Sequence, residues 1–266
     1  MLFDKKFDLI FSLGEDCACT SYLRRFNLQE YSYPFDWLTK ADFFTRMDLL
    51  INDFDGFLEK ENLAIIAYSY QKTINKHTDD YKDTKTDFHF YHDFDTKMPF
   101  DKAFALVKAK YQRRIARLYQ QIQSAQDILI CWWSRDKHQD IDKVKASCTR
   151  LSQKFAGKNI SMLLIESGKE SQQFYPLNAN GGGGGIMLLQ YDNTSFKHNP
   201  NYNATMGNEA NNNAIFEKIE RKKKSKDYAK LAIFYIVNFF INFAPLKKSR
   251  RRLRDKWRFY FFRDKL

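Results

Sequence analysis

Residues 11–37 read FSLGEDCACTSYLRRFNLQEYSYPFDW, and this stretch decides the fold of the amino-terminal part of the chain. It continues an apolar run over residues 7–13 that is typical of a buried strand. The run stops at Gly14, and residues 18–26 then have the composition of a helix. The sequence therefore predicts a strand, a short turn and a helix, with Cys17 where the turn meets the helix.

Cys17 is the candidate nucleophile that this arrangement predicts. The first turn of a helix carries unpaired N–H groups and the positive end of the helix dipole, and both favour the reactive thiolate. The alternative is a buried structural thiol, because cysteine is among the most buried residue types. We expect Cys19 to pack in the core, Asp16 to be able to cap the helix, and Ser12 to be a weaker nucleophile candidate inside the strand.

The rest of the chain alternates apolar and amphipathic segments. We expect strands at residues 63–70, 88–94, 127–133, 160–166 and 186–191, and helices at residues 41–51, 101–124 (with Asp101 as the N-cap) and 141–155. This order predicts an α/β fold, a three-layer domain with a parallel sheet and right-handed crossovers. Residues 71–87 and the glycines at 181–185 are expected to be loops. In such a sheet reactive groups gather beyond the carboxyl ends of the strands, so Cys17, residues 133–140 and His92, near the end of its aromatic segment, could meet at one edge.

The basic character of the chain lies in its last residues. The formal net charge is +12, and residues 221–266 hold 16 Lys or Arg against three Asp, which leaves −1 for residues 1–220. We therefore divide the chain into an α/β catalytic domain, residues 1–220, and a basic amphipathic segment, residues 221–266. Its apolar stretch, residues 231–244, is shorter than the roughly 20 residues that span a bilayer.

The pattern of that carboxyl-terminal segment predicts a peripheral membrane contact. Basic clusters flank the apolar stretch, as in helices that lie on an anionic inner-membrane surface. A core helix with a solvated tail is the alternative, and nucleic-acid binding is not expected because no recognised module is present. The start of the sequence lacks a secretory pattern and the four cysteines are too few for a disulfide scaffold, so we expect a cytoplasmic protein with reduced thiols.

Two motifs carry a resemblance to a known family. The residues Ser12-Leu13-Gly14-x-x-Cys17 and Pro34-Phe35-Asp36-Trp37 resemble the uncharacterised bacterial family of papain-like cysteine peptidases, a domain of unknown function. Residues 91–94, Tyr-His-Asp-Phe, are similar to its His-Asp-Phe element, and residues 111–118 to its arginine-bearing helix. The resemblance covers about residues 8–165. The Cys-Gly-x-Cys-Trp setting of papain itself is absent.

The resemblance implies a cysteine–histidine pair. We expect Cys17 to attack a carbonyl carbon, His92 to act as general base, and Asp36 to orient the histidine. Neighbouring side chains on a strand point to opposite faces, so the adjacent Asp93 is a poor partner for His92. His89 and His138 are the alternative bases, the latter within an Asp-x-His at residues 136–138.

A further set of residues is expected to bind substrate. These are Gly14, Asp16, Trp37, Arg113 and Arg117. Arg113 and Arg117 are four residues apart and share a helix face, where they could clamp a carboxylate or a phosphate; a solvated helix face is the alternative. Arg114 lies between them. Backbone N–H groups at the start of the helix would stabilise an oxyanion.

The sequence thus predicts a thiol-dependent hydrolase or acyltransferase that needs no metal or cofactor. Its substrate would be a peptide, an ester or a thioester, and the carboxyl-terminal segment suggests envelope or surface-polysaccharide precursors. Two alternatives remain: a non-covalent glycan-pathway transferase whose arginines bind a phosphorylated sugar, and a membrane-recruited binding protein.

Overall fold

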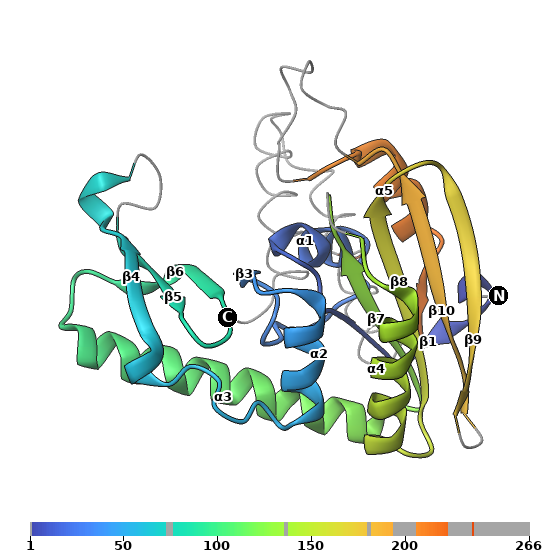
Figure 1. Cartoon of the computed structure of the whole chain (residues 1–266), viewed down its shortest axis with the longest axis horizontal. Helices are drawn as coiled ribbons and strands as arrows, with labels where there is room; N and C mark the ends of the chain where they lie inside the picture. The colour runs from blue at the N-terminus through green and yellow to red at the C-terminus, as the bar shows by residue number, and fades with distance from the viewer. Residues whose placement is uncertain are drawn as a thin grey trace.

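The computed structural model describes residues 2–72, 77–135, 138–179, 182–193, 206–222 and 236, and shows a mixed α/β protein (Figure 1). Its helices are α1 (Cys17–Arg25), α2 (Phe43–Ile51), α3 (Phe100–Ser124), α4 (Ile141–Lys154) and α5 (Glu209–Phe216). Short 3-10 turns occur at Leu2–Asp4, Lys60–Asn62 and Ser69–Gln71.

A five-stranded sheet forms the centre of the protein. Its strand order is β2 (Leu9–Ser12), β7 (Asp127–Trp133), β8 (Asn159–Ser167), β10 (Gly182–Tyr191) and β9 (Ser171–Ala179). The first four strands are parallel, and β9 pairs antiparallel with β10 at the edge. The inner strands β7 and β8 are buried along almost their whole length because helices cover both faces of this sheet.

Alternate residues of the central strands enter two separate cores. On one face Phe11, Ile130 and Trp132 pack with residues of α2, α3 and α4. On the other face Leu129 and Trp133 pack with residues of α1 and α5. The period of two along each strand thus divides one apolar run between the two helical layers.

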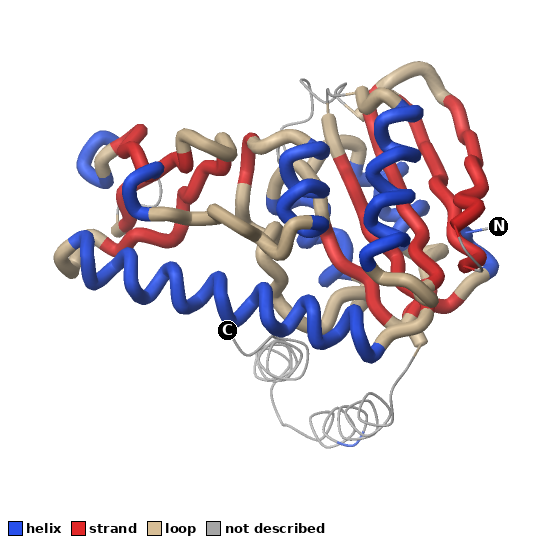
Figure 2. The backbone as a smooth tube through the Cα atoms, turned by 60° about the horizontal axis from the view of Figure 1, so that its bottom comes forward, coloured by secondary structure: helices blue, strands red, loops and turns tan. Residues whose placement is uncertain are grey.

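A second, four-stranded antiparallel sheet stands beside the central one. Its order is β3 (Thr39–Lys40), β6 (Phe88–Asp95), β5 (Thr78–Asp83) and β4 (Leu63–Ala67). The long helix α3 runs beneath this sheet and continues beneath the central sheet (Figure 2). A two-stranded ribbon joins β1 (Lys6–Phe7) to β11 (Glu220–Arg221).

The mixed α/β class that the sequence predicts is confirmed, whereas a single parallel sheet is only part of the architecture. The strand expected at 127–133 is present with those bounds, and the helix expected from Asp101 begins one residue earlier with Pro99 at its N-cap. Residues 71–87 are not all loop, because they contain β5. The polar sequence of β5 carries no strand pattern, but its backbone pairs with β4 on one side and β6 on the other.

The prediction of a glycine loop at 181–185 is also wrong. Glycines 182–185 belong to β10 and pair with β9, while Gly181 lies outside the described residues. A Cβ atom on Gly184 would lie 1.8 Å from the carbonyl oxygen of Ile160. Glycine is needed here because another backbone approaches closely, a common reason for glycine within a strand.

The basic carboxyl-terminal segment lies almost wholly outside the described residues, including the predicted interfacial stretch apart from Ile236. Its first two residues join the fold: Arg221 belongs to β11, and the Nζ atom of Lys222 donates to Asp8 and Asp127 at 3.0 and 2.7 Å. None of the helices in the described ranges has both the length and the apolarity that a bilayer crossing requires.

Candidate functional site

Cys17 is the first residue of α1, and it follows the carboxyl end of β2. Asp16 is the N-cap, and its Oδ1 atom accepts a hydrogen bond of 2.8 Å from the backbone N–H of Ala18. The predicted capping role of Asp16 is therefore confirmed. Cys17 is partly exposed, whereas Cys19 and the other two cysteines are buried. The expectation that Cys19 packs in the core is confirmed as well.

Gly14 allows the first turn of α1 to lie close to β2. A Cβ atom at Gly14 would lie 2.6 Å from the Cβ atom of Cys19, closer than two carbon atoms can approach. The N–H of Gly14 donates to the Oγ atom of Ser12 at 3.1 Å. Ser12 and Gly14 are both buried, so the structure places them in the packing beneath Cys17 and brings neither to a substrate surface.

Arg46 holds the backbone that leads to Cys17, and the sequence analysis did not identify it. The side chain lies in α2 and is fully buried. It donates to the carbonyl oxygens of Leu13, Glu15, Leu38 and Ala41 at 2.9–3.2 Å. Its guanidinium also lies over the rings of Phe35, Phe88 and Trp132. The sequence feature that could have indicated a buried role for Arg46 is its place between Phe43 and Leu50 on the apolar face of a helix.

Burial lowers the pKa of Arg46 to about 9, although nearby acidic groups oppose the change. Within the described ranges no carboxylate forms an ion pair with this guanidinium. A buried cation is ordinarily paired with an anion, so four carbonyl acceptors are an uncommon means of compensation.

Two polar pairs join the turn at Cys17 to the loop that follows β7. Arg135 forms an ion pair of 2.6 Å with Asp16, and the Oγ atom of Ser134 donates to Glu15 at 2.7 Å. These residues confirm that the carboxyl ends of β2 and β7 meet at one edge, as the sequence predicts. The Asp16 carboxylate accepts hydrogen bonds from the backbone N–H of Ala18 and from Arg135. These structural contacts explain the presence of Asp16 at this position without a role in substrate binding.

The pKa of the Cys17 thiol is raised, whereas the position at a helix start was expected to favour the thiolate. Partial burial is the largest cause, and the negative charge of Asp16 adds to it. The backbone amide and Arg135 act in the opposite direction but do not outweigh burial. The position at a helix start is as predicted, but desolvation decides the protonation state.

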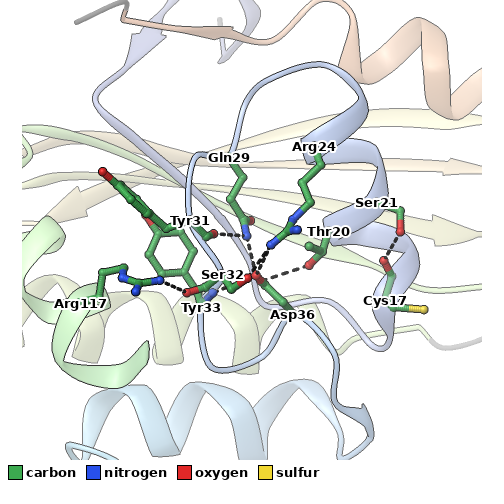
Figure 3. Close-up of polar contacts among 10 residues, drawn as sticks. All are labelled: Cys17, Thr20, Ser21, Arg24, Gln29, Tyr31, Ser32, Tyr33, Asp36 and Arg117. Atoms are coloured by element: carbon green, nitrogen blue, oxygen red, sulfur yellow. Dashed lines mark hydrogen bonds and ion pairs between the residues drawn. The ribbon is translucent and has the colours of Figure 1, made fainter. Parts of the chain in front are cut away.

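Asp36 is the centre of a buried polar network that links α1 to residues 29–36 (Figure 3). Its carboxylate accepts hydrogen bonds from Thr20, Gln29 and the backbone N–H of Tyr33 at 2.6–3.1 Å, and Arg24 lies 3.8 Å away. Burial raises the pKa of Asp36 to about 6, because desolvation outweighs these partners. The sulfur of Cys17 points away from this network (Figure 3).

The structure does not assemble the predicted triad. His92 lies exposed on β6, in the antiparallel sheet, and within the described residues no hydrogen bond joins it to Cys17 or Asp36. His89 is on the same strand, where it contacts Tyr91 at 3.0 Å and Asp87 at 3.5 Å. The strand that carries both histidines belongs to the antiparallel sheet, whereas Cys17 follows a strand of the central sheet, so His92 does not lie at the carboxyl edge of the central sheet as the sequence predicts.

His138 is the histidine that the described structure places in the loop at the edge of the central sheet. Its Nδ1 atom lies 3.5 Å from Glu166, and its side chain is 57% exposed. Glu166 ends β8 and is buried, and burial raises the pKa of its carboxyl group. The carboxylate of Glu166 also accepts a hydrogen bond of 2.9 Å from the backbone N–H of Gln139. The Asp-x-His pattern is not tested, because residue 136 lies outside the described part.

The two arginines of the predicted clamp have different surroundings. Arg113 is exposed, whereas Arg117 donates to the carbonyl oxygen of Ser32 at 3.2 Å and lies over the ring of Tyr31. Arg114, between them, is buried. Trp37, also expected to bind substrate, is partly buried under the guanidinium of Arg24 at 5.1 Å. Arg117 and Trp37 thus support the packing of the loop that carries Asp36. In the described ranges no group of three metal-binding side chains comes together.

The fold and the site together define a mixed α/β protein with one partly exposed cysteine at the start of a helix, directly after a parallel strand. The chain belongs to the family described as "Putative papain-like cysteine peptidase", a domain of unknown function, whose profile matches residues 8–169. The family resemblance stated from the sequence motifs is thereby confirmed.

A curated relative is "Uncharacterized protein R408" of Acanthamoeba polyphaga mimivirus. It is 28% identical over 123 residues, which cover 42% of this chain and 55% of the relative. The chain thus spans about half the length of that relative. The relative is viral, so it lends no support to the expected bacterial source. No solved structure matches the chain.

Proposed function

We propose that this protein is a thiol-dependent hydrolase that acts through Cys17. The observation that carries the proposal is that Cys17, alone among the four cysteines, is partly exposed, at the carboxyl edge of the central sheet. The other three are buried, and burial raises the pKa of both Cys19 and Cys148 to about 12. Nucleophilic cysteines need access to substrate, and this edge is where α/β proteins commonly act.

The raised pKa of Cys17 determines what mechanism is needed. A thiol that stays protonated at neutral pH requires a base to remove its proton as the sulfur attacks. In the proposed reaction the Cys17 sulfur bonds to the carbonyl carbon while its proton passes to His138, which Glu166 orients. The leaving alcohol or amine then takes that proton, and water hydrolyses the thioester to release the acid and the free thiol.

His138 replaces His92 in this proposal because of position. His138 follows β7, the strand that pairs with β2, and Cys17 follows β2. The described structure shows no hydrogen bond between His138 and Cys17, and catalytic contacts often tighten only when substrate binds.

The acceptor of the acyl group can equally be an alcohol or an amine, which would make the protein an acyltransferase. A peptide bond, an ester or a thioester would each fit the same covalent step. An envelope or surface-polysaccharide precursor, and a peripheral site on the inner membrane, remain proposals from residues 221–266. The alternative of a phosphorylated-sugar transferase has less support, because Arg117 already donates to the carbonyl oxygen of Ser32 and Arg113 is exposed.

The first experiment measures release of p-nitrophenol from p-nitrophenyl acetate, with peptide mass spectrometry to locate the acetyl group. The comparison includes the wild type and four variants, Cys17→Ala, His138→Ala, His92→Ala and Cys148→Ala. We expect Cys17→Ala to abolish the initial burst and His138→Ala to slow it about 100-fold, the lower end of general-base effects. His92→Ala and Cys148→Ala should leave the burst unchanged.

Equal release by the wild type and Cys17→Ala would refute a thiol enzyme. A burst that His92→Ala abolishes and His138→Ala leaves intact would restore the assignment made from the sequence motif. The acetylated residue identifies the nucleophile directly, so the two results separate the role of Cys17 from the choice of histidine.

A further inference from the structure

The backbone next to Cys17 is hydrogen-bonded to a buried cation, the side chain of Arg46 in α2. Arg46 of α2 reaches the carbonyl oxygens of Leu13 and Glu15, at 3.2 and 2.9 Å, in the turn between β2 and α1. Its two other acceptors, Leu38 and Ala41, follow the Pro-Phe-Asp-Trp motif. One side chain thus fixes both segments that carry the family motifs.

The direction of one peptide group follows from this contact. In a trans peptide the carbonyl oxygen and the next N–H point in opposite directions. The carbonyl of Glu15 points to the buried guanidinium, so the N–H of Asp16 points away from the interior. Within the described part of the chain, no hydrogen-bond acceptor is paired with the N–H of Asp16, and the N–H of Cys17 interacts with the sulfur of its own side chain, whereas the N–H of Ala18 donates to the Asp16 side chain.

We infer that Arg46 is a positioning residue for the chemistry at Cys17, and that it acts by turning the N–H of Asp16 outward to join the N–H of Cys17 as an oxyanion donor. The inference rests on the proposed function. When the Cys17 sulfur adds to a carbonyl, the oxygen gains a negative charge, and backbone donors held in place stabilise it without reorganisation. Arg46 itself touches neither the sulfur nor the carbonyl.

The choice of residue supports this role over simple packing. An apolar side chain of similar length would fill the space among Phe35, Phe88 and Trp132 without the cost of a buried charge. Only a guanidinium donates in several fixed directions at once, so only arginine can orient carbonyls from two segments together. A role in orienting these peptide groups for the reaction at Cys17 therefore explains why a buried charge is retained at this position.

The test compares two reactions at the same sulfur atom. Acetylation of Cys17 by p-nitrophenyl acetate forms an oxyanion, whereas alkylation by iodoacetamide displaces iodide and forms none. In Arg46→Lys, which keeps a long basic side chain but loses the fork of donors, we expect acetylation to slow about 100-fold, the effect of losing one oxyanion donor. Alkylation should change less than twofold. The matched control is Arg150→Lys, an exposed arginine of α4 paired with Asp48, which should alter neither rate.

Two results would overturn the inference. Equal losses in acetylation and alkylation would mean that Arg46 only maintains the fold, and unchanged acetylation would mean that it positions nothing. If the wild-type burst does not depend on Cys17, the proposed function fails and the inference with it. A Cys17-dependent burst that survives Arg46→Lys removes the inference alone.

A measurement on the wild-type chain covers the case in which Arg46→Lys does not fold. Acetaldehyde adds to a thiol and places an oxygen where the oxyanion forms. We expect the amide resonances of both Asp16 and Cys17 to shift on formation of the adduct at Cys17. An adduct that leaves the Asp16 amide resonance in place would overturn the inference.

Discussion

Replacing Asp36 by Asn should make the stability of the protein less dependent on pH. The pKa of Asp36 is about 6 in the folded protein against an ordinary value of 3.8, because burial outweighs its hydrogen-bond donors. The folded state therefore holds the proton more tightly than the unfolded state. Stability is highest below pH 4, falls as pH rises between about 4 and 6, and is level above that range as far as this group is concerned.

The size of the effect follows from the two pKa values. A difference of about two pH units corresponds to about 3 kcal/mol in the free energy of unfolding, of which about 2 kcal/mol is lost between pH 4.5 and pH 7. Asparagine fits the same network. Its oxygen can accept from Gln29 and the Tyr33 N–H, and its amide nitrogen can donate to the hydroxyl of Thr20. Asp36→Asn should therefore gain about 2 kcal/mol relative to the wild type over that pH range.

The assay is urea unfolding of the whole chain, followed by tryptophan fluorescence at several values between pH 4.5 and pH 7. Asp55→Asn, at an exposed carboxylate in the loop after α2, is the matched control and should run parallel to the wild type. A constant difference between Asp36→Asn and the wild type would show that Asp36 titrates normally. A difference that changes in the opposite direction would show that Arg24 and Arg114 hold the carboxylate ionised.

Two further substitutions test the packing around α1. Gly14→Ala should destabilise the fold by about 1–3 kcal/mol, because the added methyl group meets the Cβ atom of Cys19. The same change should cost much less in a Cys19→Gly background. Thermal melts of the wild type, the two single variants and the double variant would measure the coupling energy between the two positions. Asn212→Leu removes the oxygen that accepts from the Trp133 indole N–H, at 2.8 Å, and from the Tyr191 hydroxyl. We expect the free energy of unfolding, measured with a chemical denaturant, to fall by about 1–3 kcal/mol. An unchanged unfolding midpoint would mean that water satisfies both donors.

Local patterns predicted the elements around Cys17 well. The apolar runs of β7 and β8, the glycine at residue 14 and the capping aspartate at residue 16 each depend on neighbours close in sequence. The amino-terminal motif also carried the family correctly. Where the pattern is weak, as in the polar strand β5, pairing with two neighbouring strands decided the structure.

The candidate site depended more strongly on tertiary structure. His92 and Cys17 belong to one set of family motifs, but His92 lies on β6 of the antiparallel sheet and Cys17 begins the helix that follows β2 of the central sheet. The order of strands in space cannot be read from spacing along the chain. Asp36 was expected beside a histidine and instead accepts hydrogen bonds from residues of α1 and the following loop. The sequence did not predict a role for Arg46, because its four carbonyl partners come together only after folding.

The amino-acid sequence by itself determined the mixed α/β class, the family and the position of Cys17 at the start of a helix, because each follows from apolar periodicity or a short motif. The tertiary structure alone decided the protonation of that cysteine, which histidine shares its edge, and what Asp36 and Arg46 contact. Those properties depend on burial and on the meeting of residues far apart in the chain, and desolvation at Cys17 outweighs the local effect of the helix start.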